Sequence, residues 1–389
     1  MIEKKVVLKA GKEKAILNRH HWIFSGAIAD TPKNLEGDIL PVYSYKGDLL
    51  GSAYFNSQAK IFGRMLSYGD KAPLEAFYEN LDAAFELRAR VFEKDLTNAY
   101  RLVNGEGDFL PGIIIDRYDE GLVLQISTLG MEKLKPDLIE YLKAKLNPAF
   151  IYEKSTLPSR KEEGLHAFEQ LLWGTIQDEI TILENGIKFF VSPIHGQKTG
   201  FFLDHRDMRE QVRTLSKNKR VLNCFAYTGG FSIYAANGEA VLVDSVDISE
   251  TAMQLAQKNA QLNHITIPMH FYTEDVFQFL RQSSLDYDLV ILDPPAFAKR
   301  QKDIIPACRG YKDINRVAIQ KMPAQSLLLT SSCSYFVDEE LFQKVVFQAA
   351  AEAKRKVRII GRHRLAEDHP INIFHPEGDY LKSLLLYIE

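Results

Sequence analysis

Three patterns of apolar and polar residues follow one another along the chain. Up to about residue 70, short apolar runs alternate with turn residues, and Gly-Asp pairs at 37–38, 47–48 and 69–70 mark three of these turns. Short strands separated by recurrent turns are typical of small β-barrels. The sequence therefore predicts an N-terminal β-barrel over residues 1–71.

The second pattern begins at residue 72 and has a helical period. The stretch 73–92 repeats apolar residues every three or four positions after a proline, which predicts an amphipathic helix. Apolar runs predict strands, and one further periodic stretch predicts a helix. The strands are expected at 109–118, 121–127 and 150–155, and the helix at 135–146. Residues 72–184 are therefore expected to form a mixed α/β domain.

In the third pattern, over residues 185–389, apolar strands alternate regularly with amphipathic helices. The expected strands are 219–224, 241–249, 268–276, 287–297, 326–334, 356–364 and 380–389. Strands that alternate with helices predict a parallel, doubly wound sheet. The fold class is therefore α/β, with a seven-stranded Rossmann-like sheet as the third domain.

Composition limits the class of protein. A chain of 389 residues can form two or three domains, and its 46% hydrophobic residues argue against extended disorder. The three cysteines are scattered without a Cys-x-x-Cys pair, which excludes a disulfide framework and a cysteine zinc site. No apolar signal segment or run of roughly 18 apolar residues is present. We expect a cytoplasmic protein without a membrane partner or a bound metal.

The net charge of −3 conceals an uneven distribution. Residues 1–70 carry ten Lys/Arg and seven Asp/Glu, residues 71–190 carry 14 and 21, and residues 191–389 carry 24 and 23. The acidic excess is thus confined to the middle of the chain. The two ends are compatible with an anionic partner such as a nucleic acid, although charge alone does not indicate one.

A ligand site is expected where the first strand of the third domain ends, because ligands of such sheets bind at the carboxyl ends of the strands. The segment 223–232, Asn-Cys-Phe-Ala-Tyr-Thr-Gly-Gly-Phe-Ser, places two glycines there, and these let a ligand approach the backbone. It is not the Gly-x-Gly-x-x-Gly dinucleotide fingerprint, and Lys198-Thr199 is not part of a P-loop. An ordinary strand-to-helix turn is the alternative for this segment alone.

Acidic residues follow the next two strands. Asp247 could accept both hydroxyls of a ribose, since Ser249 is available to cap the following helix. Asp275 could accept a hydrogen bond from an adenine amino group, although a helix N-cap is the commoner role of a lone aspartate at such a place. Together with the glycine turn, the two carboxylates form the layout of an adenosyl-ligand site.

The fourth and fifth strands end in residues that could bind a substrate or take part in catalysis. The fourth ends in Asp293-Pro294-Pro295-Ala296-Phe297, in which two prolines hold a rigid turn. The carboxylate could bond the polar edge of a flat substrate, and the phenyl ring could stack on its face. The fifth ends in Ser-Ser-Cys333-Ser, where a thiolate could act as a nucleophile. Cys224 and Cys308 are expected to be core residues.

Together these segments resemble the class I S-adenosylmethionine-dependent methyltransferases, and most closely the bacterial family of 23S rRNA 5-methylcytosine methyltransferases. The resemblance covers essentially the whole chain. Residues 19–28, Arg-His-His-Trp-Ile-Phe-Ser-Gly-Ala-Ile, are similar to the opening of that family's PUA domain, an RNA-binding β-barrel. Residues 104–118 are similar to its central α/β domain, and 197–206 to the stretch before the glycine turn.

The resemblance implies S-adenosylmethionine as the cofactor. In the family, the Lys-Thr-Gly-Phe-Phe stretch lies against the cofactor, and the glycine turn and the two acids hold its adenosine. The residues of this chain that match are Lys198, Thr199, Phe202, Phe225, Tyr227, Gly229, Asp247, Asp275 and Asp293, with Asp204 and Arg206 as additional candidates.

The implied reaction is methylation of cytosine C5, with Cys333 adding to C6 and Asp293 stabilising the intermediate. The partner would be 23S rRNA or a precursor of the large ribosomal subunit, whose target base is flipped out of its stack. The residues expected to contact this substrate are Pro294, Phe297, Lys299, Arg300, Arg309 and Tyr311.

The sequence departs from the pattern of RNA 5-methylcytosine methyltransferases at one position, and other reactions therefore stay open as alternatives. Many RNA 5-methylcytosine methyltransferases carry a second cysteine in the fourth-strand turn, but here that turn reads Asp-Pro-Pro-Ala. The base that resolves the intermediate is therefore undetermined. The same turn resembles that of amino-methylating enzymes, so N-methylation of a guanine or adenine is an alternative, as is a non-catalytic RNA-binding assembly factor. The barrel argues against a small-molecule methyltransferase. The target nucleotide, the state of the rRNA and formation of a homodimer are not determined by the sequence.

Overall fold

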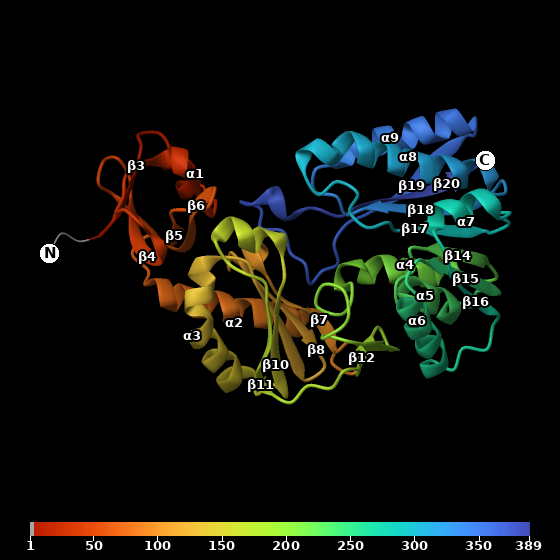
Figure 1. Ribbon diagram of the computed structural model, residues 1–389, viewed down its shortest axis with the longest axis horizontal. Coiled ribbons are helices and arrows are strands. Elements are labelled where there is room, and N and C mark those ends of the chain that lie inside the picture. The colour runs from red at the N-terminus through yellow and green to blue at the C-terminus, as the bar shows by residue number, and fades with distance from the viewer. Residues whose placement is uncertain (1–3) are drawn as a thin grey trace. The chain divides into compact units, whose positions relative to one another are not determined.

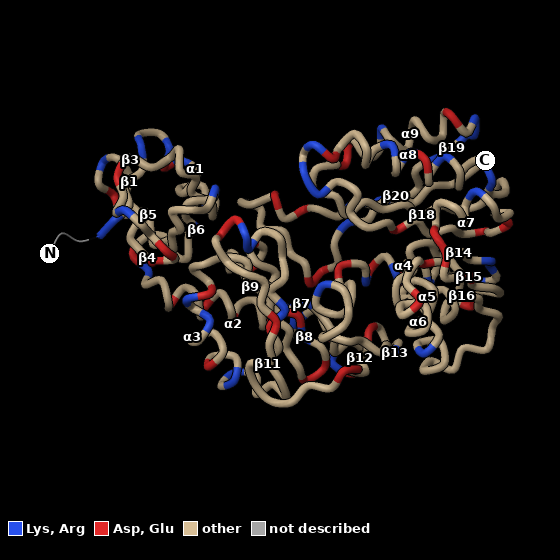
Figure 2. Tube along the Cα trace, in the orientation of Figure 1, with Lys and Arg blue, Asp and Glu red and all other residues tan. Residues whose placement is uncertain are grey.

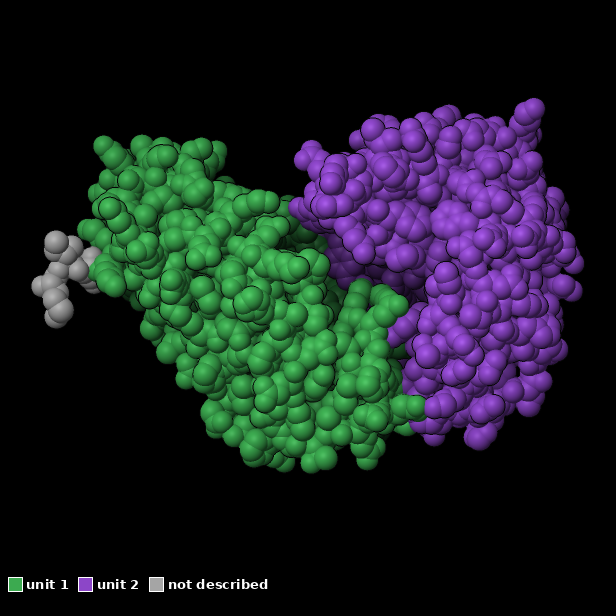
Figure 3. Space-filling model, in the orientation of Figure 1, with its two compact units in different colours: residues 1–183, 191–203, 367–378 green, residues 184–190, 204–366, 379–389 purple. Residues whose placement is uncertain are grey.

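The computed structural model describes residues 4–389 and divides into two compact units (Figures 1 and 3). Unit 1 holds the chain up to Leu183 together with residues 191–203 and 367–378. Unit 2 holds residues 184–190, 204–366 and 379–389. The chain therefore passes from one unit to the other several times, and neither unit is a single continuous stretch.

The first sheet of unit 1 has six strands in the order β2-β6-β5-β4-β1-β3. Its strands are β1 (Val6–Leu8), β2 (Trp22–Phe24), β3 (Ile28–Asp30), β4 (Glu36–Tyr43), β5 (Leu49–Asn56) and β6 (Ile61–Tyr68), with the short helix α1 (Lys14–Leu17). Val6, Leu8, Val42 and Met65 are fully buried in its core. The predicted N-terminal β region is confirmed.

The second sheet of unit 1 has five strands in the order β11-β10-β9-β8-β7. It comprises β7 (Ala99–Asn104), β8 (Ile113–Tyr118), β9 (Gly121–Ile126), β10 (Phe150–Ser155) and β11 (Phe168–Gly174), with helices α2 (Pro73–Val91) and α3 (Leu129–Leu146). The two helices and the three central strands were predicted, whereas β7 and β11 were not. Helix α3 begins six residues before the predicted start because the Thr128 side chain caps it by accepting from Met131 N.

Buried polar side chains connect the parts of unit 1. Glu163 accepts hydrogen bonds from Asn56 at 2.8 Å and from Arg64 at 2.6 Å. Arg88 of α2 donates to both carboxylate oxygens of Asp108 at 2.6 and 2.8 Å, and both residues are buried. Such charged pairs are tolerated in an interior only with good geometry, so they fix how these elements pack.

Unit 2 is built on a seven-stranded sheet in the order β16-β15-β14-β17-β18-β20-β19. Its strands are β14 (Arg220–Cys224), β15 (Leu242–Asp247), β16 (Met269–Thr273), β17 (Leu289–Leu292), β18 (Ser326–Ser332), β19 (Val357–His363) and β20 (Lys382–Ile388). The Rossmann-like fold class is confirmed, but the expectation of a wholly parallel sheet is wrong for β20. This last strand is inserted antiparallel between β18 and β19, so the chain closes the sheet by reversing its direction.

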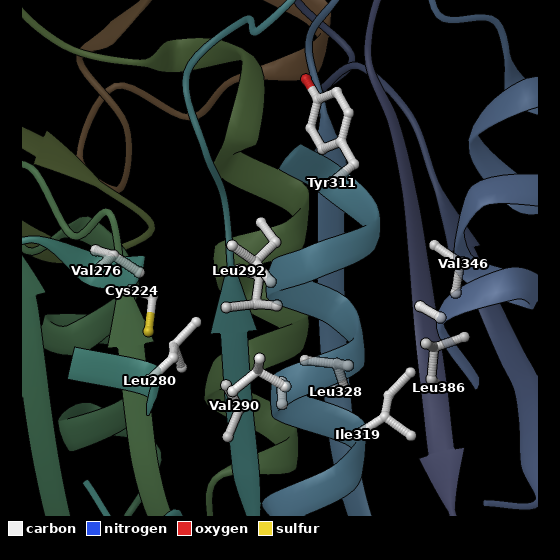
Figure 4. Packing of buried hydrophobic residues seen from close by; sticks show 14 of the residues in the cluster. Cys224, Val276, Leu280, Val290, Leu292, Tyr311, Ile319, Leu328, Val346 and Leu386 are labelled. Atoms are coloured by element: carbon white, nitrogen blue, oxygen red, sulfur yellow. The ribbon is translucent and has the colours of Figure 1, made fainter. Parts of the chain in front are cut away.

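Helices cover both faces of this sheet. They are α4 (Arg206–Leu215), α5 (Gly230–Asn237), α6 (Glu250–Leu262), α7 (Val276–Gln282), α8 (Ile304–Lys321) and α9 (Glu339–Ala353). The strands bury both faces: Leu289 and Ile291 pack with α4 and α5, whereas Val290 and Leu292 pack with α7, α8 and α9. Figure 4 shows part of the core between the sheet and helices α7, α8 and α9. No helix within residues 4–389 is long and apolar enough to cross a membrane.

Two cysteines belong to the core that Figure 4 shows. Cys224, at the end of β14, is fully buried among apolar side chains, and Cys308 of α8 is partly buried against the same core. Both predictions are confirmed. A short hairpin of β12 (Ile180–Glu184) and β13 (Ile187–Val191) lies where the chain leaves unit 1 and returns to it.

Candidate functional site

The glycine turn after β14 has an unusual backbone. Phe225, Tyr227 and Gly229 have φ angles of 59°, 47° and 80°, and the last of these precedes the first residue of α5. A Cβ atom at Gly229 would lie 2.9 Å from the Cβ of Ala256. Because left-handed conformations are costly for residues other than glycine, such turns are found mostly where function requires them.

Asp247 supports this turn from the end of β15. Its Oδ2 accepts a hydrogen bond from Tyr227 N and its Oδ1 accepts one from Ser249 N, both at 2.9 Å. Each carboxylate oxygen can accept a second bond, so ribose hydroxyls can still be bound. The next residue, Ile248, is 74% exposed and offers an apolar surface that the sequence analysis did not single out.

Asp275 caps helix α7, because its Oδ1 accepts from Gln278 N at 2.9 Å. That bond accounts for an aspartate at this position, and its contact with an adenine stays a prediction. The ring of Phe277 lies 6.3 Å from that of Phe225 and 6.1 Å from that of Phe297. Phe277 of α7 thus lies near aromatic rings from the segments that follow β14 and β17.

Asp293 and His205 lie together in unit 2. Asp293 follows β17, and its Oδ2 lies 3.5 Å from His205 Nε2. The carboxylate side chain is 19% exposed and the imidazole 4%, so the acid faces outward and the histidine supports it from inside. The sequence analysis named Asp204 and Arg206 but missed His205, which stands between them in the same stretch.

Cys333 lies beside the Asp-Pro-Pro turn. The strands β17 and β18 are parallel neighbours, with Leu292 opposite Thr330, so the segments that follow them meet at one edge of the sheet. The thiol of Cys333 donates to the carbonyl oxygen of Pro294 at 3.8 Å. The structure therefore brings the candidate nucleophile and the turn that carries Asp293 together, and Cys333 is only partly buried.

The side chain of Ser334, the residue after Cys333, anchors the same segment by hydrogen bonds. Its Oγ lies 2.8 Å from the hydroxyl of Tyr311 and accepts from Ala298 N at 3.1 Å. Tyr311 is fully buried and its hydroxyl is bonded within the protein, so these contacts lend no support to the expected substrate contact, which stays a prediction. Phe297 packs on the Tyr311 ring at 4.6 Å and is only partly exposed.

The other expected substrate contacts fall into two groups. Lys299, Arg300 and Arg309 are exposed in unit 2, and Arg300 forms an ion pair with Asp303 at 3.2 Å. Pro294 is buried and presents its carbonyl to Cys333. An aromatic pair that the sequence analysis missed, Tyr335 and Phe336, follows Ser334 directly.

Three expected cofactor residues, Lys198, Thr199 and Phe202, belong to unit 1. Thr199 is buried, donates to Asp116 Oδ2 at 2.5 Å and is hydrogen-bonded to the hydroxyl of Tyr118 at 2.9 Å. The ammonium of Lys198 lies 4.4 Å from the centre of the Phe202 ring. The glycine turn belongs to unit 2, so contact of these residues with the cofactor stays a prediction.

The additional candidates Asp204 and Arg206 are both 2% exposed in unit 2. Asp204 Oδ2 accepts from the Tyr380 hydroxyl at 2.6 Å, and Arg206 Nε lies 3.4 Å from a carboxylate oxygen of Glu184. These partners account for both residue types without a cofactor. Their proposed cofactor contact therefore has no support from the geometry of their side chains.

One set of side chains within residues 4–389 is close enough to hold a metal ion, namely His20, His375 and Glu377 of unit 1. The Nδ1 of His20 accepts from Trp22 N at 3.2 Å, which leaves the proton of a neutral ring on Nε2. That nitrogen lies 3.3 Å from Glu377 Oε1, at hydrogen-bond distance. Hydrogen bonding thus accounts for His20 and for one carboxylate oxygen of Glu377.

Comparisons with known proteins agree with the fold. A family model described as S-adenosylmethionine-dependent methyltransferase matches residues 164–357, and one described as a PUA-like domain matches residues 6–68. The crystal structure of a candidate methyltransferase complexed with SAH superposes with a TM-score of 0.84 at 26% identity, covering 99% of this chain and all of that one. The protein is thus an S-adenosylmethionine-dependent methyltransferase with an N-terminal PUA-like domain.

Two curated relatives narrow this class. Ribosomal RNA large subunit methyltransferase I of Shewanella denitrificans is 40% identical over 390 residues, covering 98% of each chain. The protein of the same name from Photobacterium profundum is 40% identical over 393 residues, covering 99% of each. The chain belongs to the ribosomal RNA large subunit methyltransferase I family, and S-adenosylmethionine is its cofactor.

Proposed function

We propose that this protein transfers a methyl group to C5 of a cytosine in the RNA of the large ribosomal subunit, with Cys333 as nucleophile. The names of its relatives supply the substrate class. The observation that carries the position of methylation is the half-buried thiol of Cys333, placed against the carbonyl of Pro294 next to Asp293. A thiol at this place has no role in methyl transfer to an amino group.

The chemistry requires a covalent step because C5 of cytosine is a weak nucleophile. The Cys333 thiolate forms a bond to C6, and the electrons of the C5–C6 double bond become available at C5. C5 would then take the methyl group as its bond to the sulfonium sulfur breaks and that sulfur leaves as a neutral thioether, so C5 would carry both the methyl group and its proton. A base removes the proton, the double bond re-forms and the C6–sulfur bond breaks, which releases the thiolate.

Asp293 is placed to stabilise this intermediate. Its carboxyl would share a proton with N3 of the ring, where negative charge develops when sulfur adds to C6. His205 Nε2, 3.5 Å from Asp293 Oδ2, orients that carboxyl and can exchange a proton with it. The Pro295 carbonyl would accept from the exocyclic amine, since the Pro294 carbonyl accepts from Cys333.

The residues of the glycine turn fit S-adenosylmethionine. The turn has left-handed residues at 225, 227 and 229, Asp247 keeps acceptor capacity for ribose hydroxyls, and Ile248 offers an exposed apolar surface. When bound, S-adenosylmethionine supplies an electrophilic sulfonium methyl group. We propose Phe225, Tyr227, Gly229, Asp247 and Asp275 of unit 2 as its binding residues.

The surface near Cys333 suits an RNA substrate. Lys299, Arg300 and Lys302 are exposed on the segment before α8, where Figure 2 shows clustered basic residues. Tyr335 and Phe336, 54% and 36% exposed, form an edge-to-face pair at 5.3 Å directly after Ser334. Cations contact phosphates and aromatic rings stack on unpaired bases, which is the combination that binds single-stranded nucleic acid.

The test is the modified nucleoside itself. Ribosomal RNA from cells with and without the gene is mapped by bisulfite sequencing and mass spectrometry, and one 5-methylcytosine is expected to disappear. Cys333→Ala should abolish its restoration, whereas Cys308→Ser, which removes a different partly buried thiol, should restore it. Normal 5-methylcytosine formation by Cys333→Ala would contradict the proposal.

N-methylation of a guanine or adenine is the second candidate. It is favoured by the Asp293-Pro294-Pro295-Ala296 turn, which lacks the second cysteine of many RNA cytosine-C5 enzymes. The same mass spectrometry distinguishes the two reactions, since a methylated purine would be lost instead of 5-methylcytosine. In that reaction, Cys333→Ala would retain activity.

A further inference from the structure

A buried lysine is hydrogen-bonded to the backbone of the Cys333 segment, residues 332–334. Lys382, the first residue of β20, is 8% exposed, and its ammonium donates to the carbonyl oxygens of Ser334 at 2.5 Å and Tyr380 at 2.9 Å. Strand β20 pairs with β18 so that Lys382 lies opposite Ser332. A cation from the last strand of the chain thus reaches the residue that follows Cys333.

The two hydrogen bonds do not explain why this residue is charged. Both acceptors are backbone carbonyl oxygens, which a neutral donor could satisfy equally well. Moving an ammonium out of water is costly unless a negative charge is near. A buried lysine at this place therefore indicates an anionic neighbour.

The charged neighbours of Lys382 include Cys333. Burial lowers the pKa of Lys382 to about 8, while the negative charges of the Cys333 thiolate, Asp379 and Asp338 act to raise it. On the other sides of Cys333 lie the Pro294 carbonyl, which follows Asp293, and the buried Tyr311 of α8, whose hydroxyl reaches Ser334. Lys382 supplies the positive charge at this segment.

We propose that Lys382 is a positioning residue that holds the Cys333 segment in place and favours the thiolate form of Cys333. The inference rests on the proposed function only in taking Cys333 as the attacking group. The attraction between the two charges is reciprocal: whatever the thiolate contributes to keeping Lys382 protonated, the ammonium contributes to keeping Cys333 ionised.

The test measures the thiol without any RNA. The rate at which iodoacetamide alkylates Cys333 is followed from pH 6 to pH 10 by mass spectrometry of the peptide that contains it, in the full chain. Lys382→Met should slow alkylation about tenfold at pH 7, which corresponds to a thiol pKa about one unit higher. The two rates should converge at high pH, where both thiols are ionised.

Two variants separate charge from shape. Lys382→Arg keeps the charge and should stay within about twofold of the wild type, whereas Lys382→Gln keeps a donor for the Ser334 carbonyl and should be slowed like Lys382→Met. Lys321→Met is the control: the ammonium of the exposed Lys321 likewise donates to backbone carbonyl oxygens, those of Leu280, Arg281 and Ser283, and its loss should leave the profile unchanged. Coincident profiles for Lys382→Met and wild type, or equal slowing at every pH, would overturn the proposal.

A reciprocal measurement does not depend on the stability of Lys382 variants. In protein with ¹³C-labelled lysine, NMR follows the titration of Lys382 in the wild type and in Cys333→Ser. Removing the thiolate should make Lys382 lose its proton at lower pH, and an unchanged titration would contradict the coupling. If the coupling holds but no 5-methylcytosine is formed, the proposed reaction is wrong and this inference stands.

Discussion

Two cysteines of unit 2, Cys224 and Cys333, have very different surroundings. Cys224 and Cys333 both end a strand of the same sheet, but Cys224 is fully buried in apolar core, where burial raises the pKa of its thiol well above the usual range. Cys333 is partly exposed and has a carbonyl and a buried ammonium near it. Only the second environment suits a nucleophile.

Tyr335 provides a test of substrate contact at the level of one side chain. Tyr335→Ala should raise the KM for RNA about tenfold without changing the KM for S-adenosylmethionine, since stacking of a base on an aromatic ring contributes about 1–3 kcal/mol. Steady-state kinetics with an rRNA fragment measures both constants. Phe347→Ala removes an aromatic side chain that is 70% exposed on α9 and should change neither. An unchanged KM for RNA in Tyr335→Ala would mean that the pair does not contact the substrate.

Arg88 provides a test of stability. Arg88→Met leaves the carboxylate of Asp108 buried without its bidentate partner and should lower the free energy of unfolding by about 3–5 kcal/mol. Urea denaturation followed by circular dichroism measures the loss. Arg90→Ala, on the same helix, removes a side chain that is 80% exposed and should cost no more than about 0.5 kcal/mol. Similar losses in the two variants would show that the buried pair is not a major stabilising contact.

At the level of elements, the periodicity of apolar residues predicted individual helices and strands. It did not predict residues whose position depends on contacts with distant parts of the chain. Helix α2 and strands β8 to β10 follow directly from their apolar patterns, and the order of polar turns placed Asp293 next to Cys333. His205 and Lys382 could not be found this way. The first is placed by packing against Asp293, and the second by the reversed direction of β20, which no local pattern encodes.

The glycine turn is the element whose backbone is most directly testable. Gly229→Ala should weaken S-adenosylmethionine binding at least tenfold in calorimetry, because φ is 80° and the new methyl group would meet Ala256 at 2.9 Å. Gly69→Ala has a similar φ of 70° with nothing within 4 Å, so it should cost about 1 kcal/mol of stability and leave binding unchanged. Equal binding by both variants would argue against the turn as the cofactor site.

At the scale of the molecule, unit 1 should lose stability in acid, and unit 2 should share part of this sensitivity because burial also lowers the pKa of its His363. Burial lowers the pKa of His21 to about 4 and also lowers that of His375, and both residues belong to unit 1. In the unfolded chain a histidine titrates near pH 6.5, so below that pH the unfolded state binds more protons than the folded state. The stability of unit 1 should therefore be complete above about pH 6.5 and fall as the pH drops toward 4.

Calorimetric melting between pH 7.5 and pH 4.5 measures this loss, which for His21 alone amounts to about 3 kcal/mol at most. His21→Gln cannot take up the proton and should flatten the dependence. His264→Gln, at an exposed position of unit 2, is the control and should melt with the wild-type dependence. An equally steep loss in His21→Gln would assign the acid sensitivity to other groups.

The division of unit 1 into segments has a consequence for synthesis of the chain. Asp368 accepts from Arg88 through its carbonyl oxygen and from the Arg101 backbone through its carboxylate, across 280 and 267 residues. An emerging polypeptide exposes its N-terminal half long before residues 367–378 leave the ribosome. Unit 1 must therefore remain incomplete until residues 367–378 have been synthesised, and a product truncated before residue 367 would lack a segment of the first unit as well as strand β20 of the second.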